Sequence, residues 1–463
     1  MLREYQKKAL DQIREHIRRG EKRILLQMPT GAGKTVVFSE ILKGVAIKQK
    51  NAAMVTRGRK LVDQCSKRLQ REQVSHGVLM AGHWNVNRLA QIQICSIDTI
   101  RSREHYPKAD LIVYDEVHYA ISKSYLDFVS KYPNAVHLGV TATPYTEKSL
   151  RHIANVIVKP ISMSELIDQG YLVPPVYYAP TAQDVSKVRI SQSTKDYVVA
   201  DLEDILNGND IVGNLVENWK LYGQNRPTLV FAVSVAHSKH IAKMYCDAGI
   251  PAEHCDAETP EREREAVLAR FESGETKIIT NVGLWCTGVD IPHVGCIQMA
   301  RPTKSYILYI QQAGRGTRTF QDKKDFILLD NAGNVLRHGF ITDEPEANLD
   351  GKKIKESVTP IKTCNSCFAV FNRFKTCCPQ CGWKNPIGNN EREITEADGT
   401  LIRIEEMPLE AKAFQEFVRL KKIQKEKKYK RGWVWHCMKT TFGEEIASKY
   451  VPKREVPSWV VRK

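Results

Sequence analysis

Short apolar runs alternate with segments of helical pattern through the first part of the chain. Each run has the length of a strand and is apolar at nearly every position, as is typical of a parallel sheet covered by helices on both faces. The alternation itself predicts an α/β domain. The runs are Arg23–Gln27, Ala52–Thr56, Ile92–Cys95, Leu111–Tyr114 and Val136–Val140.

A helix is expected before the first of these runs, over residues 4–19. Its apolar face carries Ala9, Ile13 and Ile17, and Gly20 is suited to end it. After a break at Lys159–Pro160 and the pair Pro174–Pro175, the alternation of strands and helices returns. The second set of apolar runs is Thr228–Ala232, Lys277–Thr280, Gly295–Met299 and Phe326–Asp330. The pattern therefore predicts two parallel-sheet lobes.

Composition adds the class of partner. The hydrophobic content of 42% and charged content of 26% are ordinary for a globular protein in water. No apolar run approaches the roughly 18 residues of a membrane span, so no membrane partner is expected. The N-terminus lacks the apolar stretch of a secretory signal. The net charge of +16 favours a polyanionic partner.

A glycine-rich loop follows the first predicted strand and opens a helix, the context of a phosphate-binding loop. Glycines let backbone N–H groups approach phosphate oxygens, a lysine reaches the β- and γ-phosphates, and a hydroxyl holds Mg²⁺. Met28 stands where the generic pattern begins with glycine, and the alternative is a simple glycine-rich turn. The loop residues are Thr30, Gly31, Ala32, Gly33, Lys34 and Thr35.

Two carboxylates end the apolar run Leu111–Tyr114, at the edge where α/β sheets bind ligands. Asp115 is expected to coordinate Mg²⁺ through water, and Glu116 to orient or activate the attacking water. A solvated acidic turn is the alternative interpretation. Farther on, Arg315 and Arg318 are spaced to face one ligand from a single helix face. Their planar forks suit the charge on a transferring phosphoryl group, so we interpret them as arginine fingers rather than surface arginines.

Together these motifs resemble those of superfamily 2 helicases of the DEAH-box type, and most closely the RadD-type bacterial and phage DNA helicases. More specific segments also carry the resemblance, which covers most of the chain. Thr287 and Asp98 depart from it, because glutamate and glutamine are usual there. The further segments are Leu2–Gln6, Met80–Gly82, Ser96–Ile100, Arg301–Ser305 and Leu308–Gln312.

The resemblance implies roles for further residues. Gln6 should recognise adenine, and Gly288 and Asp290 should contact ATP across the cleft between the lobes. Residues expected to couple hydrolysis to movement are His118, Thr141, Thr143 and Gln311. Residues expected along the nucleic-acid track are Thr56, Arg57 and Thr280. The family match favours DNA over RNA.

Four cysteines follow the lobes as two Cys-x-x-Cys pairs, Cys364 with Cys367 and Cys378 with Cys381. In a chain without a secretion signal this spacing favours a metal over disulfides. Four thiolates suit tetrahedral Zn²⁺ and leave no open position, so the site should be structural. Cys377 is the spare cysteine, and a redox pair or chance cluster is the alternative.

A basic segment follows the cysteines. Residues 412–431 contain nine lysine or arginine residues and two glutamates, a local charge of +7. Such a run is usually a solvated helix face. The flanking aromatic residues make contact with a nucleic-acid backbone plausible, with base stacking on the rings, while docking onto a lobe or a partner stays open. These aromatic residues are Phe414, Phe417, Trp433 and Trp435.

The expected fold class is thus α/β, with two RecA-like lobes, a small four-cysteine zinc module and a basic tail. The expected ranges are 1–160 and 161–345 for the lobes, 346–390 for the linker and zinc module, and 391–463 for a basic helical region. The expected function is an ATP-dependent DNA helicase or translocase that uses Mg²⁺ and acts on repair or recombination intermediates. Alternatives are a duplex-remodelling translocase, an RNA helicase and a non-motor zinc scaffold.

The resemblance also suggests partners and location. Single-stranded or branched DNA is the expected substrate, and single-strand-binding or recombination proteins are candidate partners. The cytoplasm of a bacterium or of a phage-infected host is the expected compartment.

Overall fold

The computed structural model describes most of the first 384 residues and part of the C-terminal region. The chain forms two compact units, Met1–Ile387 and Gly388–Lys463, which we describe separately. The described residues are 2–146, 148–179, 185–192, 194–206, 209–285, 291–351, 360–384, 413, 416–417, 420–421, 423–424, 429 and 432–451. None of the described helices is long and apolar enough to cross a membrane.

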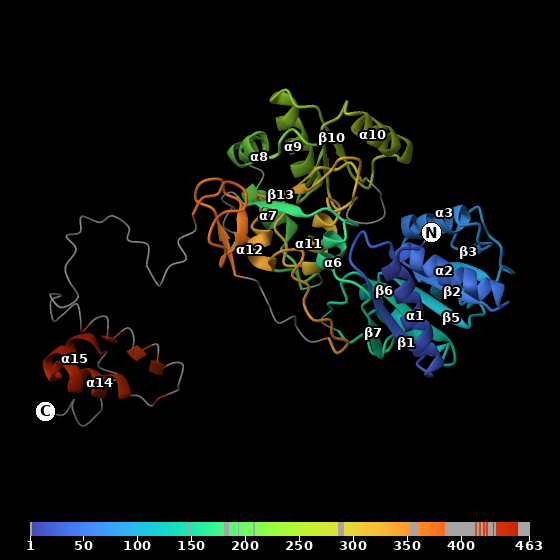
Figure 1. Ribbon diagram of the computed structural model, residues 1–463, viewed down its shortest axis with the longest axis horizontal. Coiled ribbons are helices and arrows are strands. Elements are labelled where there is room, and N and C mark those ends of the chain that lie inside the picture. The colour runs from blue at the N-terminus through green and yellow to red at the C-terminus, as the bar shows by residue number, and fades with distance from the viewer. Residues whose placement is uncertain are drawn as a thin grey trace. The chain divides into compact units, whose positions relative to one another are not determined.

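The first lobe is a seven-stranded sheet in the order β3-β4-β2-β5-β6-β1-β7. It is the blue-to-teal part of the ribbon in Figure 1. All neighbouring strands are parallel, as the continuous apolar runs predict. The strands are β1 (Arg23–Gln27), β2 (Ala52–Thr56), β3 (Gly77–Leu79), β4 (Ile92–Ser96), β5 (Leu111–Asp115), β6 (Val136–Thr141) and β7 (Val156–Val158).

Helices cover both faces of this sheet. In β1, Ile24 and Leu26 join one core cluster and Leu25 joins the other, so successive side chains are buried on opposite faces. In α1, Ala9 and Ile13 are buried as expected, but Ile17 is 38% exposed, so the buried stripe ends a turn earlier than predicted. The helices are α1 (Glu4–Arg18), α2 (Lys34–Ile47), α3 (Arg59–Arg71), α4 (Ile97–Arg103), the 3-10 turn η1 (Val117–Tyr119), α5 (Lys123–Ser130) and α6 (Met163–Asp168).

The second lobe is a six-stranded parallel sheet in the order β10-β11-β9-β12-β13-β8. The prediction of two parallel-sheet α/β lobes is therefore confirmed. The strands are β8 (Pro175–Tyr178), β9 (Thr228–Phe231), β10 (Ala252–Cys255), β11 (Ile278–Asn281), β12 (Cys296–Met299) and β13 (Phe326–Asp330). The helices are α7 (Val199–Leu206), α8 (Asn209–Tyr222), α9 (Val235–Asp247), α10 (Glu261–Ser273), α11 (Tyr306–Ala313) and α12 (Asn334–His338).

Two described segments pass between the lobes. The first passage lies between Leu172, which is buried in the core of the first lobe, and Val173, which is buried in the core of the second. The second passage is the return segment, residues 342–351, which comes back from α12 to the first lobe. There the Leu150 amide donates a 2.8 Å hydrogen bond to the Leu349 carbonyl, and the Leu349 side chain joins the first lobe's core. This stretch is polar in sequence, yet it is packed.

The four-cysteine module packs on the second lobe. Its strands β14 (Ile361–Thr363) and β15 (Val370–Asn372) pair antiparallel, and Ala369 forms a bridge with Tyr178 of the edge strand β8. Ala369, Phe371, Cys364 and Cys378 belong to the same buried cluster as side chains of β9, β12 and β13. The module is therefore continuous with the second lobe's core.

The C-terminal unit has a small core of its own. It contains α14 (Trp433–Phe442) and α15 (Glu444–Tyr450). Its buried residues include Val434, Trp435 and Met438. Much of the basic run at 412–431, including Phe414, lies outside the described residues.

Candidate active site

The phosphate-binding loop connects β1 to α2, at the carboxyl end of the first sheet. Gly31 and Gly33 have φ angles of +84° and +80°, which favour glycine. A Cβ atom on Gly33 would lie 2.6 Å from Gln6 Nε2, and one on Gly31 would lie 2.9 Å from Leu172 Cδ2. The loop therefore needs glycine for both its conformation and its neighbours. Thr30, Ala32 and Thr35 complete the loop, and α2 begins at Lys34.

Lys34 lies within this loop. Its Nζ donates to the carbonyl oxygens of Met28 at 3.3 Å and Pro29 at 3.5 Å. Burial lowers the pKa of Lys34, while the carboxylates of Glu116 and Asp115 oppose the shift. The amine is thus placed between the loop and the acidic pair, as a lysine that binds phosphate oxygens requires.

Gln6 of α1 is packed against the same loop. Its Nε2 donates to the Ala32 carbonyl at 3.2 Å, and its Oε1 accepts from the Arg3 amide at 3.0 Å. The Tyr5 hydroxyl donates to the same Ala32 carbonyl at 3.0 Å. The structure thus brings Gln6 to the phosphate loop, where a role in nucleotide recognition stays a prediction.

The acidic pair follows β5 directly. Asp115 is the last residue of the strand, and its Oδ1 accepts from the Glu116 amide at 3.0 Å. Burial raises the pKa of Asp115 to about 7, the charge of Glu116 adds to the shift, and Lys34 opposes it. A divalent cation would stabilise the ionised carboxylate, so this donor fits Mg²⁺.

Glu116 is held in an unusual conformation, with a φ of +47° that few residues other than glycine adopt. His118 Nδ1 lies 3.3 Å from Glu116 Oε2 and 2.9 Å from Thr141 Oγ1. Thr141 Oγ1 accepts from the Thr143 amide at 3.1 Å and donates to Glu116 Oε2 at 3.4 Å. The predicted coupling residues of this lobe therefore form one network with the acidic pair.

Several buried polar atoms near these motifs lack a hydrogen-bond partner among the described residues. They are His118 Nε2, Thr143 Oγ1 and Gln311 Nε2. Burial lowers the pKa of His118, so its ring is neutral and Nε2 can accept a hydrogen bond. Unpaired buried polar groups are uncommon and are typical of sites that a ligand or water completes.

The two arginines come from the second lobe, but their placement corrects the sequence prediction. Helix α11 ends at Ala313, so Arg315 lies in the turn after it and Arg318 forms a bridge with Leu172. They do not share a helix face. Both charges nevertheless act on Lys34 and lower its pKa. Arg315 is 6% exposed, so its guanidinium is held inside the fold.

The turn that carries both arginines, residues 314–318 (the arginine turn), directly contacts the phosphate loop. A Cβ atom on Gly314 would lie 2.9 Å from Thr30 Cβ. Thr317 Oγ1, which donates to the Gly314 carbonyl at 3.0 Å, lies near Gly31. The structure therefore brings the arginines, Lys34 and the acidic pair into one composite site.

The residues predicted to contact nucleic acid differ in their exposure. Arg57 is exposed at the end of β2, whereas Thr56 is 1% exposed. Thr280 is fully buried in β11, and its hydroxyl donates to the Ser238 carbonyl at 2.9 Å. Its side chain is therefore not exposed to a nucleic-acid strand in this structure. Gly288 and Asp290, like Thr287, lie outside the described residues.

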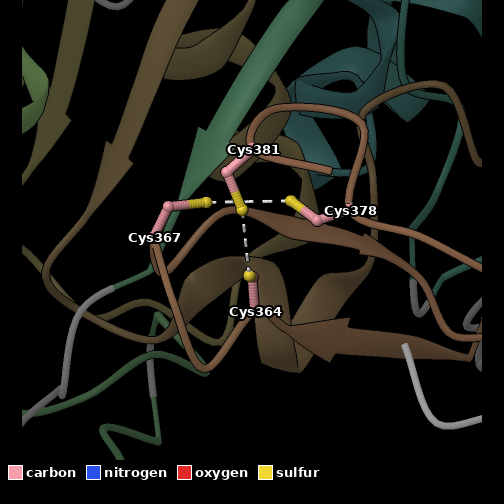
Figure 2. A group of neighbouring side chains, drawn as sticks. All are labelled: Cys364, Cys367, Cys378 and Cys381. Atoms are coloured by element: carbon pink, nitrogen blue, oxygen red, sulfur yellow. Dashed lines mark hydrogen bonds between the residues drawn. The ribbon is translucent and has the colours of Figure 1, made fainter. Parts of the chain in front are cut away.

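The four cysteines of the module form a metal-ligating cluster (Figure 2). Their sulfur atoms all lie within 4.8 Å of one another, with Cys364 to Cys381 at 3.6 Å and Cys367 to Cys378 at 3.7 Å. A tetrahedral ion with Zn–S bonds of about 2.3 Å requires sulfur atoms about 3.8 Å apart. The cluster therefore fits one tetrahedral ion. Cys377 is exposed and lies outside the cluster.

Sequence reasoning did not single out Tyr145 or Lys323. Tyr145 directly follows the Thr141–Pro144 motif, and its ring lies 5.3 Å from that of Tyr306 in α11. Its hydroxyl donates to the Pro345 carbonyl of the return segment at 2.8 Å. In the sequence, the signal for these contacts with the second lobe and the return segment is the position of Tyr145 directly after a motif.

Two protein families match the chain in succession. Residues 1–146 match the type III restriction enzyme res subunit (ResIII), which includes the phosphate loop and the acidic pair. Residues 209–319 match the helicase conserved C-terminal domain (Helicase_C), which includes Arg315 and Arg318.

Relatives of the chain include a viral and two cellular proteins. A 51.5 kDa protein of Lactococcus phage (isolate 7-9) is 29% identical over 85% of this chain and 85% of its own length. The Saccharomyces cerevisiae protein designated ATP-dependent helicase IRC3 is 27% identical over 72% of this chain and 52% of its own. DNA 3'-5' translocase XPB2 of Sulfurisphaera tokodaii is 24% identical over 66% of this chain and 77% of its own. The chain thus spans most of the phage protein and about half of the yeast protein.

The fold is also found in a solved structure. A fragment assigned to the HsdR subunit of a type I restriction enzyme from Vibrio vulnificus YJ016 has a TM-score of 0.57 and 22% identity. The likeness covers 75% of this chain and 66% of that one, and at this identity it concerns the fold alone.

Proposed function

The chain belongs to the superfamily 2 helicases, which are ATPases, and we propose that it couples ATP hydrolysis to movement along DNA. Its motifs support a place among the RadD-type bacterial and phage helicases of the DEAH-box type. The relative named as a DNA translocase and the net charge of +16 support DNA as the substrate. Repair or recombination intermediates are the proposed targets, in a bacterial or phage-infected cell.

The proposal assigns the ATP chemistry to residues of both lobes. Backbone N–H groups of the phosphate loop and Lys34 bind the β- and γ-phosphates. Thr35 and Asp115 would hold Mg²⁺, which would supply positive charge to neutralise the charge that develops on the phosphates. Glu116 orients the attacking water. Arg315 and Arg318 stabilise the charge of the transferring phosphoryl group.

The close approach of Gly314 to Thr30 is the observation that carries this assignment. Lobe separation would remove both arginines from the phosphate loop, because the turn that carries them approaches the loop from the second lobe. Hydrolysis then depends on the arrangement of the lobes, as a motor requires. The network of Glu116, Thr141 and His118 links the position of the water-orienting carboxylate to the Thr143 loop.

We assign the four-cysteine cluster to zinc. Its thiol ligands, its spacing and the absence of a fifth donor in the cluster as described favour a closed structural site over a catalytic one. The ion stabilises the module and takes no part in hydrolysis in this proposal.

An ATPase assay with and without DNA tests the proposed function. Lys34→Ala should abolish hydrolysis, and Glu116→Gln should bind ATP but turn over on the order of 10²-fold more slowly. Lys48→Ala, on the exposed end of α2, is the matched control and should behave as wild type. Normal turnover of Lys34→Ala would refute the assignment. If RNA stimulates ATP hydrolysis and DNA does not, the substrate is RNA rather than DNA. Strand-separation assays distinguish a helicase from a duplex translocase.

A further inference from the structure

A lysine outside the helicase motifs binds the backbone of two loops of the second lobe. Lys323 lies between the arginine turn and β13. Its Nζ donates to the carbonyl oxygens of Gly316 at 2.7 Å, Val294 at 2.5 Å and Pro292 at 3.3 Å. Gly316 follows Arg315 directly, and Pro292 lies two residues after Asp290. One side chain thus joins the arginine turn to residues 292–294, which follow Asp290 closely in the sequence.

We propose that Lys323 is a positioning residue, which fixes the turn that carries Arg315 for hydrolysis. This inference rests on the proposed function, because it assumes that the arginines act on the phosphoryl group. Misplacement of a catalytic group by about 1 Å can cost on the order of 10²-fold in rate. A loop end without regular secondary structure needs such an anchor, since α11 has already ended at Ala313.

The surroundings of Lys323 favour backbone anchoring over an ordinary ion pair. Asp325 lies two residues after Lys323, directly before β13, and its carboxylate is hydrogen-bonded to Arg226. The three N–H groups of an ammonium match the three carbonyl acceptors. The Gly316 backbone is also packed tightly, because a Cβ atom there would lie 2.1 Å from Phe326 Cδ2. The turn is therefore held between a ring on one side and an ammonium on another.

The charge state of Lys323 is sensitive to this environment. Burial lowers its pKa to about 7, the positive charges of Arg226 and Arg318 add to the shift, and Asp325 opposes it. His293 faces the same region, and its own pKa is lowered by burial and by the charge of Lys323. The three carbonyl contacts favour the protonated amine, because deprotonation would leave one of the three carbonyl oxygens without a donor.

Steady-state ATPase kinetics of three variants test the inference. Lys323→Met removes the donor, Lys323→Arg keeps a charged donor, and Lys324→Met changes the adjacent exposed lysine as a matched control. We expect Lys323→Met to lower kcat by on the order of 10- to 10²-fold with KM for ATP changed less than about threefold, since Arg315 acts on the transition state. Lys323→Arg should recover most of kcat, and Lys324→Met should match wild type.

Other results would overturn the inference. A normal kcat for Lys323→Met, or a rise in KM alone, would show that Lys323 does not position the arginine turn. Lys323→Gln keeps an N–H donor and provides a second variant if the methionine variant does not fold. Arg315→Ala, measured in parallel, separates the two hypotheses. If Arg315→Ala also hydrolyses ATP normally, the proposed function fails; if only the Lys323 variants are normal, this inference alone fails.

Discussion

Removal of the metal should destabilise the second lobe, and not only the short segment that holds the ion. Cys364 and Cys378 are 0% and 1% exposed, and both belong to the core cluster that includes Ile327 and Leu329 of β13. Between the cysteine pairs, Val370 and Phe371 are also buried against this lobe. A structural metal site folds its own ligands, so loss of the ion should release these side chains together.

The size of the effect follows from the side chains released. Full burial of a valine or phenylalanine contributes about 1.5–3 kcal/mol each, so Val370 and Phe371 together contribute about 3–6 kcal/mol. A whole domain is stable by only about 5–15 kcal/mol. For a lobe of this size each kcal/mol changes Tm by about 2–4 °C, so Tm of the second lobe should fall by roughly 6–24 °C. Release of the module also uncovers the edge strand β8, whose exposure favours aggregation.

Calorimetry combined with hydrogen exchange can measure this change lobe by lobe. Cys364→Ser and chelated wild-type protein should show faster amide exchange in β9, β12 and β13, while β1 and β5 of the first lobe serve as the internal reference. Cys377→Ser is the matched control, because this exposed cysteine lies beside Cys378 but outside the cluster. If Cys364→Ser loses its zinc and the exchange and Tm of the second lobe stay unchanged, the module is independent and the reasoning is refuted.

Two further predictions concern the contacts between the lobes and the arginine turn. Tyr145→Phe should lower the free energy of unfolding by about 1–3 kcal/mol, because it removes the hydrogen bond to the Pro345 carbonyl and the acceptor of the bond from Gln27 Nε2, but keeps the ring against Tyr306. Urea titration measures the change, and no loss would contradict the role of the hydroxyl. The kcat of wild type relative to that of Lys323→Arg should decrease as pH rises through the Lys323 pKa of about 7; the comparison isolates the lysine, because Asp115, whose pKa is also about 7, titrates in both proteins. A lysine whose pKa is lowered by folding makes the fold more stable as pH rises from that value towards its usual one, so unfolding could not explain the loss of activity.

The strands that the sequence predicted share one property: they are buried on both faces, which gives continuous apolar runs. The strands it missed lie at or near sheet edges. β3 and β7 have three residues each, and two of the four residues of β10, Glu253 and His254, are polar. β8 begins at Pro175, the second residue of a proline pair that predicts a break in the pattern. An edge strand tolerates proline, because the N–H groups on its outer side need no hydrogen-bond partner from a neighbouring strand. Local pattern therefore identified the central strands and not the edges.

The candidate site shows the same limit. The positions of Lys34 after β1 and of Asp115 at the end of β5 were predictable, since they depend on residue type and local spacing, while phosphate binding by these motifs stays a prediction. The end of α11 before Arg315 was not, because Gly314 and the packing of Thr30 determine it. The attachment of the four-cysteine module to β8 was also not predictable. It joins Ala369 to Tyr178, residues that are far apart in sequence, and no local signal marks such a pair.

The contacts of Tyr145 explain how the two halves of the site can be linked mechanically. The Thr141 hydroxyl binds Glu116 and the Thr143 amide, and Tyr145 lies two residues farther along the same loop. The Tyr145 ring packs on Tyr306 at the start of α11, the helix that ends just before Arg315. The hydroxyls of these tyrosines bind the return segment at Pro345 and Asp343. Under the proposed function, a change at the γ-phosphate that moves Glu116 would reach α11 through these packed residues. The return segment would restrain such a movement, because the hydroxyls of both tyrosines are hydrogen-bonded to it.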